Sequence, residues 1–149
     1  MIIELDEQTS LSAVAVKKRA NKENFVALIH EGFNALNSFF TKSGKQLSDA
    51  PYIAYYGMGE EFDIEIGFPV AEEVPVEGEL YMSKTYGGRA VTGMHKGSYD
   101  GLEKAYGEIF KYMEENALEP AGVFYDFYLN DPTDTQEDEL LTKIVISVK

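Results

Sequence analysis

The chain has 149 residues, of which 44% are hydrophobic and 26% charged, a balance typical of folded globular proteins. It contains no cysteine, which excludes disulfide bonds, thiolate metal ligands and a cysteine nucleophile. Its 13 basic and 26 acidic residues give a net charge of -13. Such a surface repels nucleic acids and favours cationic ligands or basic protein surfaces.

In chain order, the first predicted element is a β-prone run from Leu11 to Arg19. The capping residues Asn21–Asn24 follow, and apolar residues then recur at helical spacing until Gly44. Two further β-prone runs, 51–56 and 62–70, flank the glycine-bearing turn 57–60 and predict a hairpin.

Apolar and polar residues alternate along the second strand of this hairpin, which predicts one buried (dry) face and one solvent-exposed (wet) face. The dry face holds Phe62, Ile64, Ile66 and Phe68, and the wet face holds Asp63, Glu65 and Gly67. Residues 71–79 are acidic, contain Pro75 and Gly78, and predict a surface linker.

The second half of the chain repeats this plan. Short strands are predicted at 80–85 and 89–96, and a capping box formed by Asp100 and Glu103 opens a second amphipathic helix. Strand-like runs at 122–129 and 140–148 flank an acidic turn at 130–139.

The two halves align at an offset of 77 residues, which sets Ala13 on Ala90 and Phe25 on Leu102. We interpret this as a duplicated β-α-β-β unit, with repeat 1 at about 11–70 and repeat 2 at about 80–149 of a single domain. The predicted fold is α+β, with two helices packed on one face of a largely antiparallel sheet.

Motifs for metal, nucleotide or serine chemistry are absent from the sequence. Only His30 and His95 are available as nitrogen ligands, and no nucleophile elbow or P-loop occurs. We therefore expect neither a metal nor a cofactor. No apolar stretch approaches the roughly 20 residues of a membrane span, so we expect no membrane contact. Residues 1–6 do not resemble a signal peptide, and we therefore expect a cytoplasmic protein.

The unusual feature is an aromatic strand with one carboxylate in it. Phe124, Tyr125, Phe127 and Tyr128 surround Asp126, and alternation places Phe124, Asp126 and Tyr128 on one face. Aromatic rings with a carboxylate suit a lipophilic cation, and either a bound ligand or hydrogen bonds from tyrosine hydroxyls would keep the acid ionised. The alternative is that the aromatics only favour the strand and that Asp126 points at water.

Several segments together resemble the GyrI-like small-molecule-binding family, which includes the effector-binding domains of multidrug-responsive regulators of the BmrR and Rob type. They are GRAVTGMHKGSYDGLEKAY at 88–106, FYDFYLNDP at 124–132, PYIAYY at 51–56 and FDIEIGFPV at 62–70. The resemblance implies the duplicated unit and a pseudo-twofold ligand groove where the repeats meet. Family members often carry a glutamate at the position of Asp126 and a tryptophan at that of Tyr125.

The resemblance implies a small-molecule ligand, cationic or aromatic, as the partner. The candidate ligand-binding residues are Asp126, Tyr128, Tyr125, Phe124, Tyr52, Tyr55 and Phe68. Because the matching region begins about ten residues from Met1, we expect a stand-alone member that does not bind DNA directly, as a monomer or weak dimer.

Two alternatives remain open. Some stand-alone GyrI-like proteins resemble hydrolases of strained cyclopropane rings, and Asp126 would then be the acid or base; we otherwise assign no catalytic residue. The family's gyrase-inhibiting namesake implies a third role, in which the acidic surface binds a basic protein partner.

Overall fold

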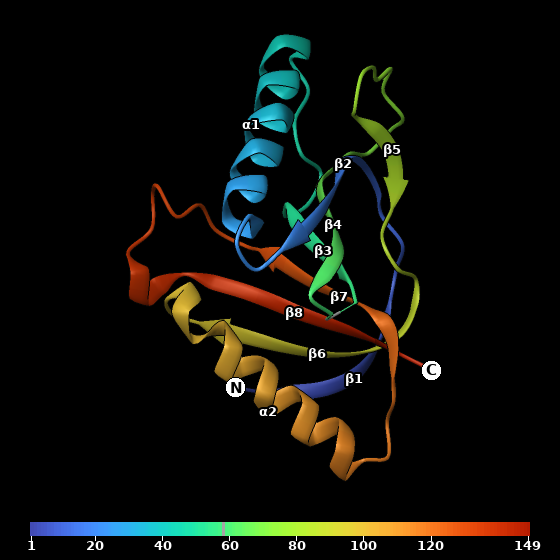
Figure 1. Ribbon diagram of the computed structural model, residues 1–149, viewed down its shortest axis with the longest axis vertical. Coiled ribbons are helices and arrows are strands. Elements are labelled where there is room, and N and C mark those ends of the chain that lie inside the picture. Colours follow the sequence, from blue (N-terminus) through green and yellow to red (C-terminus); the bar gives the residue numbers. More distant parts are fainter. Residues whose placement is uncertain (58) are drawn as a thin grey trace. The chain divides into compact units, whose positions relative to one another are not determined.

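The computed structural model describes residues 1–57 and 59–149, which form two compact units. We call residues 10–85 the N unit, and residues 1–9 together with 86–149 the C unit. Each unit contains one long helix and four strands of antiparallel sheet, which confirms the predicted α+β class (Figure 1).

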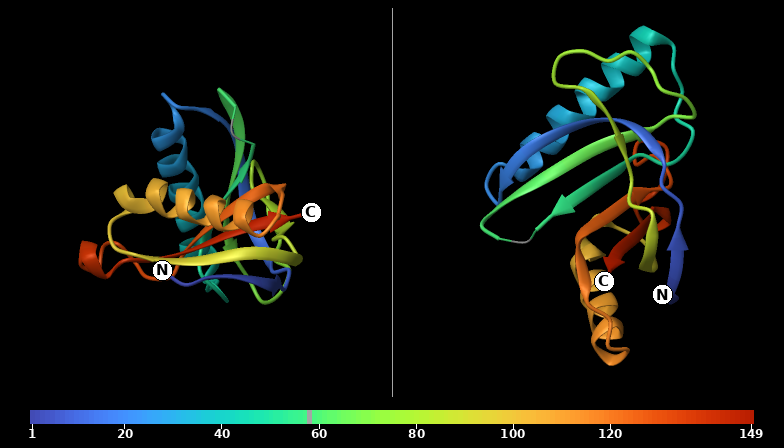
Figure 2. Two further views of the ribbon diagram at one scale, coloured as in Figure 1. Left: turned by 90° about the horizontal axis from the view of Figure 1, so that it is seen from below. Right: turned by 90° about the vertical axis from the view of Figure 1, so that its right-hand side faces the viewer.

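The N unit has the strand order β3-β4-β2-β5. Its elements are β2 (Ser12–Asn21), α1 (Phe25–Ser43), β3 (Tyr52–Tyr56), β4 (Glu61–Pro69) and β5 (Tyr81–Lys84). Helix α1 runs along one face of β2 and β4 (Figure 2, right). Gly32 permits this close packing, because a Cβ there would meet the Ile66 side chain at 2.2 Å. Phe68 packs between Phe33 and Phe40 of the helix.

The C unit has the strand order β1-β6-β8-β7. Its elements are β1 (Ile3–Gln8), β6 (Gly88–Lys96), the 3-10 turn η1 (Tyr99–Gly101), α2 (Leu102–Glu115), β7 (Pro120–Tyr128), η2 (Glu137–Glu139) and β8 (Leu141–Val148). Ile109 of α2 packs against Gly93 of β6, and Phe110 meets the ring of Phe124 edge-on at 5.9 Å. The face of β7 that carries Phe124 is therefore the face that α2 covers.

In each unit, one outer strand pairs with a strand that lies far from it in the sequence. Strand β1 pairs with β6 from Ile3↔Gly93 to Gln8↔Gly88, and β5 pairs with β2 from Ser12↔Lys84 to Ala15↔Tyr81. The strand predicted at 80–85 thus exists but completes the sheet of the first half. The sequence analysis did not predict β1, in which apolar and polar residues alternate only from Ile3 to Asp6 and four of the six residues are exposed.

The predicted faces of β4 need one correction. Ile64, Ile66 and Phe68 are buried as predicted, but Glu65 is only 3% exposed and Gly67 is also buried, so neither lies on a wet face. The reason is that hydroxyl groups surround the Glu65 carboxylate, as described below. The predicted turn at 57–60 includes residue 58, which lies outside the described residues; the two strands beside it pair as predicted.

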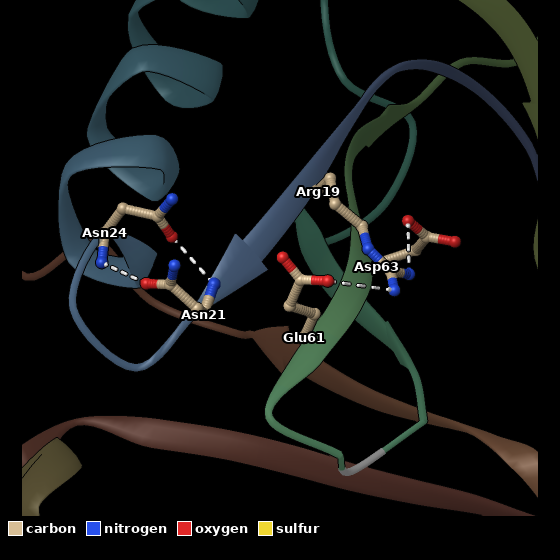
Figure 3. A network of polar contacts seen from close by, with 5 residues as sticks. All are labelled: Arg19, Asn21, Asn24, Glu61 and Asp63. Carbon is tan, nitrogen blue, oxygen red and sulfur yellow. Dashed lines mark hydrogen bonds and ion pairs between the residues drawn. The ribbon is translucent and has the colours of Figure 1, made fainter.

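Of the predicted capping residues, Asn24 stands at the N-cap of α1, but its side chain caps no N–H group of the helix. It takes part instead in a small network within the turn before the helix (Figure 3). The side-chain oxygen of Asn21 accepts hydrogen bonds from the backbone N–H groups of Glu23 and Asn24, both at 2.9 Å, and that of Asn24 accepts from the N–H of Asn21 at 2.7 Å. The helix ends at Gly44, whose φ of 67° is the left-handed conformation typical of a glycine cap.

The same figure shows Arg19 of β2 between two acids of β4. Arg19 lies 3.3 Å from Asp63 and 3.8 Å from Glu61, and its side chain is 59% exposed. Exposed ion pairs contribute little stability, so this network matters less than the packing of α1.

The predicted capping box of α2 is wrong. Gly101, not Asp100, stands at the N-cap, and no side chain caps the helix. The turn η1 intervenes instead, where the Ser98 hydroxyl oxygen accepts a hydrogen bond from the N–H of Asp100 at 3.2 Å. A pattern of two residues cannot distinguish a helix start from a 3-10 turn placed one step before it.

Candidate ligand-binding sites

Asp126 lies in the middle of β7 and is only 3% exposed. It shares the helix-covered face of the strand with Phe124 and Tyr128, as alternation predicts. The alternative that Asp126 points at water is therefore wrong. A carboxylate at such a depth needs hydrogen bonds or a countercharge to remain ionised.

Two tyrosine hydroxyls face this carboxylate. Tyr106 of α2 donates to Oδ1 of Asp126 at 2.5 Å, and Tyr128 donates to Oδ2 across a longer 3.5 Å. A hydrogen bond to an ionised acceptor is shorter and stronger than one between neutral groups. Tyrosine hydroxyls thus stabilise the acid, as the sequence predicted.

Aromatic rings from η1, α2 and β7 form ring contacts on this side of the strand. Tyr99 of η1 meets the Tyr128 ring edge-on at 5.5 Å, and Tyr106 lies 6.3 Å from Phe110, which in turn meets Phe124. Burial raises the pKa of Tyr99, and the nearby negative charge of Asp131 raises it further. The phenol of Tyr99 therefore stays neutral and presents its ring without adding negative charge.

Tyr125 belongs to the opposite face of β7. Its hydroxyl oxygen accepts a hydrogen bond from the backbone N–H of Tyr86 at 2.9 Å, and its ring stacks on Phe127 at 5.5 Å. The structure therefore brings Phe124, Asp126 and Tyr128 together but places Tyr125 on the other side of the strand.

The N unit contains a second buried carboxylate, Glu65 of β4. Tyr52 of β3 donates to its Oε2 at 2.7 Å, Tyr81 of β5 donates to Oε1, and the Ser83 hydroxyl lies 3.0 and 3.1 Å from the two oxygens. Burial raises the pKa of Tyr81, and its hydrogen bond to Glu65 raises it further. The Tyr81 phenol is thus a neutral donor to an acid.

Glu65 lies on the face of the N-unit sheet opposite α1, because its neighbours Ile64 and Ile66 face the helix. Tyr52 shares this face and lies over Gly67, where a Cβ would be 2.3 Å from the ring. Tyr52 itself is fully buried.

The other two predicted residues of the N unit lie on the α1 side. Tyr55 lies 6.0 Å from the ring of Phe25, and Phe68 lies 5.1 Å from that of Phe40. Tyr52 and Tyr55 point to opposite faces because they are three residues apart on one strand. Phe68 is 4% exposed and forms part of the helix–sheet core.

The sequence identified Tyr52 as a site residue but not the acid that it contacts, Glu65. The other residues that it did not identify are Tyr81, Ser83, Tyr106 and Tyr99. Tyr106 fitted the apolar face of the second helix, and nothing local shows that its hydroxyl reaches β7. Glu65 fitted the wet face of an alternating strand. One feature of the sequence could have indicated the buried Glu65. Ala54 pairs with Glu65 and Ala15 pairs with Gly67, and such small residues leave room for buried tyrosine rings on this face.

With this geometry described, the chain can be compared with known proteins. The model of the GyrI-like small molecule binding domain matches residues 3–149. The chain belongs to this family. The family is one of small-molecule-binding domains, and the match confirms the resemblance seen in the sequence.

Several solved structures have a similar fold. The C-terminal domain of EcmrR is 21% identical over 99% of this chain and 97% of that domain, with a TM-score of 0.84. The chain covers 57% of EcmrR as solved in a complex with DNA. SAV2435, solved bound to tetraphenylphosphonium, is 13% identical over 100% of this chain and 94% of that one, with a TM-score of 0.71. A hydrolase from Listeria innocua is 12% identical over 99% and 91%, with a TM-score of 0.68.

No curated protein matches the chain. Among the described residues, no helix is both long and apolar enough to cross a membrane, and no group of three or more histidines or acids could hold a metal ion.

Proposed function

We propose that this chain binds lipophilic organic cations and that Asp126 supplies the countercharge. The observation that supports the proposal is the buried Asp126 carboxylate, which accepts hydrogen bonds from Tyr106 and Tyr128 among aromatic rings. Its two tyrosine donors favour the ionised form, and an ionised acid in apolar surroundings attracts a ligand of opposite charge.

The surrounding rings suit a cation whose charge is spread over apolar groups. Each ring face attracts a cation by roughly 0.5–2 kcal/mol, with the larger values where water is excluded. Tyr99 and Tyr128 are partly exposed, so the rings extend from the buried acid toward the surface. The net charge of -13 would raise the local concentration of any cation and its rate of association.

The relatives support the ligand class. EcmrR, solved in a complex with DNA, contains a domain of similar fold, and SAV2435 was solved bound to tetraphenylphosphonium. This chain shares the fold and places a carboxylate among tyrosines, so we expect it to bind ligands of the same chemistry. Whether the ligand is sensed or sequestered depends on what else the chain contacts.

The test is a comparison of three phenyl-bearing compounds of different charge: tetraphenylphosphonium, neutral triphenylphosphine oxide and tetraphenylborate. A ligand at about a hundred times its dissociation constant stabilises the folded protein by roughly 2.7 kcal/mol, which thermal unfolding detects. We expect stabilisation by the cation alone, and a loss of affinity of at least about tenfold in Asp126→Asn.

The matched control is Asp134→Asn, which removes one charge from an exposed position. It should bind the cation like the wild type. Equal losses in both variants would show that total charge, not the Asp126 site, attracts the ligand. Stabilisation by all three probes alike would contradict a role for any countercharge.

A second candidate is hydrolysis of a strained ring, which the 2.5 Å contact between Tyr106 and Asp126 favours. A tyrosine and a carboxylate in contact can pass a proton to or from a reacting group. The Listeria protein of similar fold is described as a hydrolase. Incubation with a cyclopropane-bearing alkylating agent tests this, because hydrolysis adds one water to its mass; an unchanged substrate contradicts it.

A further inference from the structure

We propose that the Glu65 cluster is a second binding site, separate from the Asp126 site, and that it binds the protonated amino group of a primary amine. The cluster consists of Glu65, Tyr52, Tyr81 and Ser83 in the N unit. The inference goes beyond the proposed function, because it concerns a different carboxylate, in the other unit, with different neighbours.

Glu65 has no compensating cation among the residues that the structure describes. Lys17 stands directly opposite Glu65 in the pairing of β2 with β4, and both side chains lie on one face. The ammonium group of Lys17 nevertheless lies over the ring of Tyr56, 5.3 Å from its centre, and forms no ion pair with Glu65. The charge of the carboxylate is therefore balanced only by hydroxyl dipoles.

The hydrogen bonds of the cluster leave one acceptor position open. Tyr81 donates to Oε1 and Tyr52 to Oε2, while Ser83 lies within 3.1 Å of both oxygens but has a single hydrogen to donate. A carboxylate has about four acceptor positions, so three hydroxyls cannot fill them all. A ligand with N–H donors can occupy the remaining position.

This arrangement favours a primary ammonium over a quaternary one. An –NH₃⁺ group donates up to three hydrogen bonds, and both the carboxylate and the Ser83 and Tyr81 oxygens can accept them. A quaternary nitrogen has no hydrogen to donate, and its methyl groups would displace hydroxyls without replacing their bonds. The ring-lined Asp126 site imposes no such requirement.

The cluster has a buried side and a partly exposed side. Tyr52 is fully buried, and Ala13, Ala15 and Ala54 on the same face are fully buried as well. Tyr81 and Ser83 are partly exposed and stand on β5, a strand of four residues at the edge of the N-unit sheet. An amine would therefore approach Glu65 along the β5 side.

The experiment measures binding of 2-phenylethylammonium and its N,N,N-trimethyl analogue by calorimetry to the full chain. We expect the primary amine to bind the wild type at least about tenfold more tightly than the quaternary analogue, and Glu65→Gln to lose at least about tenfold. The control Glu61→Gln makes the same change on the same strand at a side chain that is 67% exposed, and should bind like the wild type. Equal binding of the amine to Glu65→Gln and the wild type would overturn the proposal.

Asp126→Asn separates this inference from the proposed function. It should keep its affinity for the primary amine while losing affinity for tetraphenylphosphonium. Loss of amine binding in Asp126→Asn, with none in Glu65→Gln, would mean that the amine binds at Asp126 and that the Glu65 site does not exist.

A measurement on the wild type covers the case in which Glu65→Gln does not fold. Side-chain carboxyl carbons labelled with ¹³C report directly on their hydrogen-bond partners. Saturating 2-phenylethylammonium should move the Glu65 carboxyl resonance, and the trimethyl analogue should not. A Glu65 resonance unmoved by the amine would overturn the proposal.

Discussion

Tyr106 of α2 donates a hydrogen bond to the buried carboxylate of Asp126 on β7, with 2.5 Å between the two oxygens. Helix α2 therefore contacts the strand that it covers through a hydrogen bond to a carboxylate. Contacts between a helix and a sheet are more often made by apolar side chains. The same acid that the proposed function assigns to the ligand is thus also part of the helix–sheet packing.

Replacement of Tyr106 by phenylalanine tests how much this contact stabilises the fold. The variant keeps the ring but leaves Asp126 with one donor fewer, which should lower the free energy of unfolding by roughly 1.5–3 kcal/mol. Urea denaturation measures the change. Tyr112→Phe on the same helix is the control, because no hydrogen bond of its hydroxyl is found among the described residues, and it should change stability by less than about 0.5 kcal/mol. Similar losses in both variants would contradict the special role of Tyr106.

Gly67→Ala should disturb the Glu65 cluster through Tyr52. A Cβ at Gly67 would overlap the Tyr52 ring, so the ring must shift and its hydrogen bond to Glu65 is disturbed. Overpacking of this kind costs about 1–3 kcal/mol, which thermal or urea unfolding would show.

The control is Gly107→Ala, in the interior of α2 with nothing within 4 Å of the added Cβ. It should stabilise the protein by about 0.5–1 kcal/mol, because alanine is the better helix former. A Gly67→Ala variant as stable as the wild type would show that Tyr52 can move freely.

The raised pKa of Tyr81 predicts a dependence of stability on alkaline pH. In the unfolded chain this phenol loses its proton near pH 10, whereas burial and Glu65 keep it protonated in the folded protein. Stability is therefore fully present below pH 10 and falls as the pH rises above it. Urea denaturation of the wild type and Tyr81→Phe between pH 9 and 11 should show a smaller decline in the variant. Parallel declines would contradict the assignment.

Asn21→Ala should weaken the start of α1. The Asn21 side chain accepts two backbone N–H groups in the turn before the helix, which water would have to solvate in the variant. Loss of such an intramolecular hydrogen bond costs about 0.5–1.5 kcal/mol. Asn34→Ala, exposed in the middle of the same helix, is the control and should be neutral or slightly stabilising. An Asn21→Ala variant as stable as Asn34→Ala would contradict the network in Figure 3.

The sequence alone predicted the class of fold and most of its elements, because periodicity reports directly on burial. The helix from Phe25 to Gly44 and the alternation of Ile64, Ile66 and Phe68 are local patterns, and the structure has both. The aromatic strand with Asp126 was also visible, since Phe124, Asp126 and Tyr128 are two residues apart. The capping box at Asp100 failed because a 3-10 turn has nearly the same sequence signature.

Only the tertiary structure decided what surrounds each carboxylate. Asp126 meets Tyr106, 20 residues away, and Glu65 meets Tyr52 and Tyr81, 13 and 16 residues away on two other strands. Hydrogen bonds between side chains depend on strand register and helix placement, which are fixed by the packing of the whole unit. Alternation assigned Glu65 to solvent because it records the polarity of a side chain but not the hydroxyls that make its burial possible.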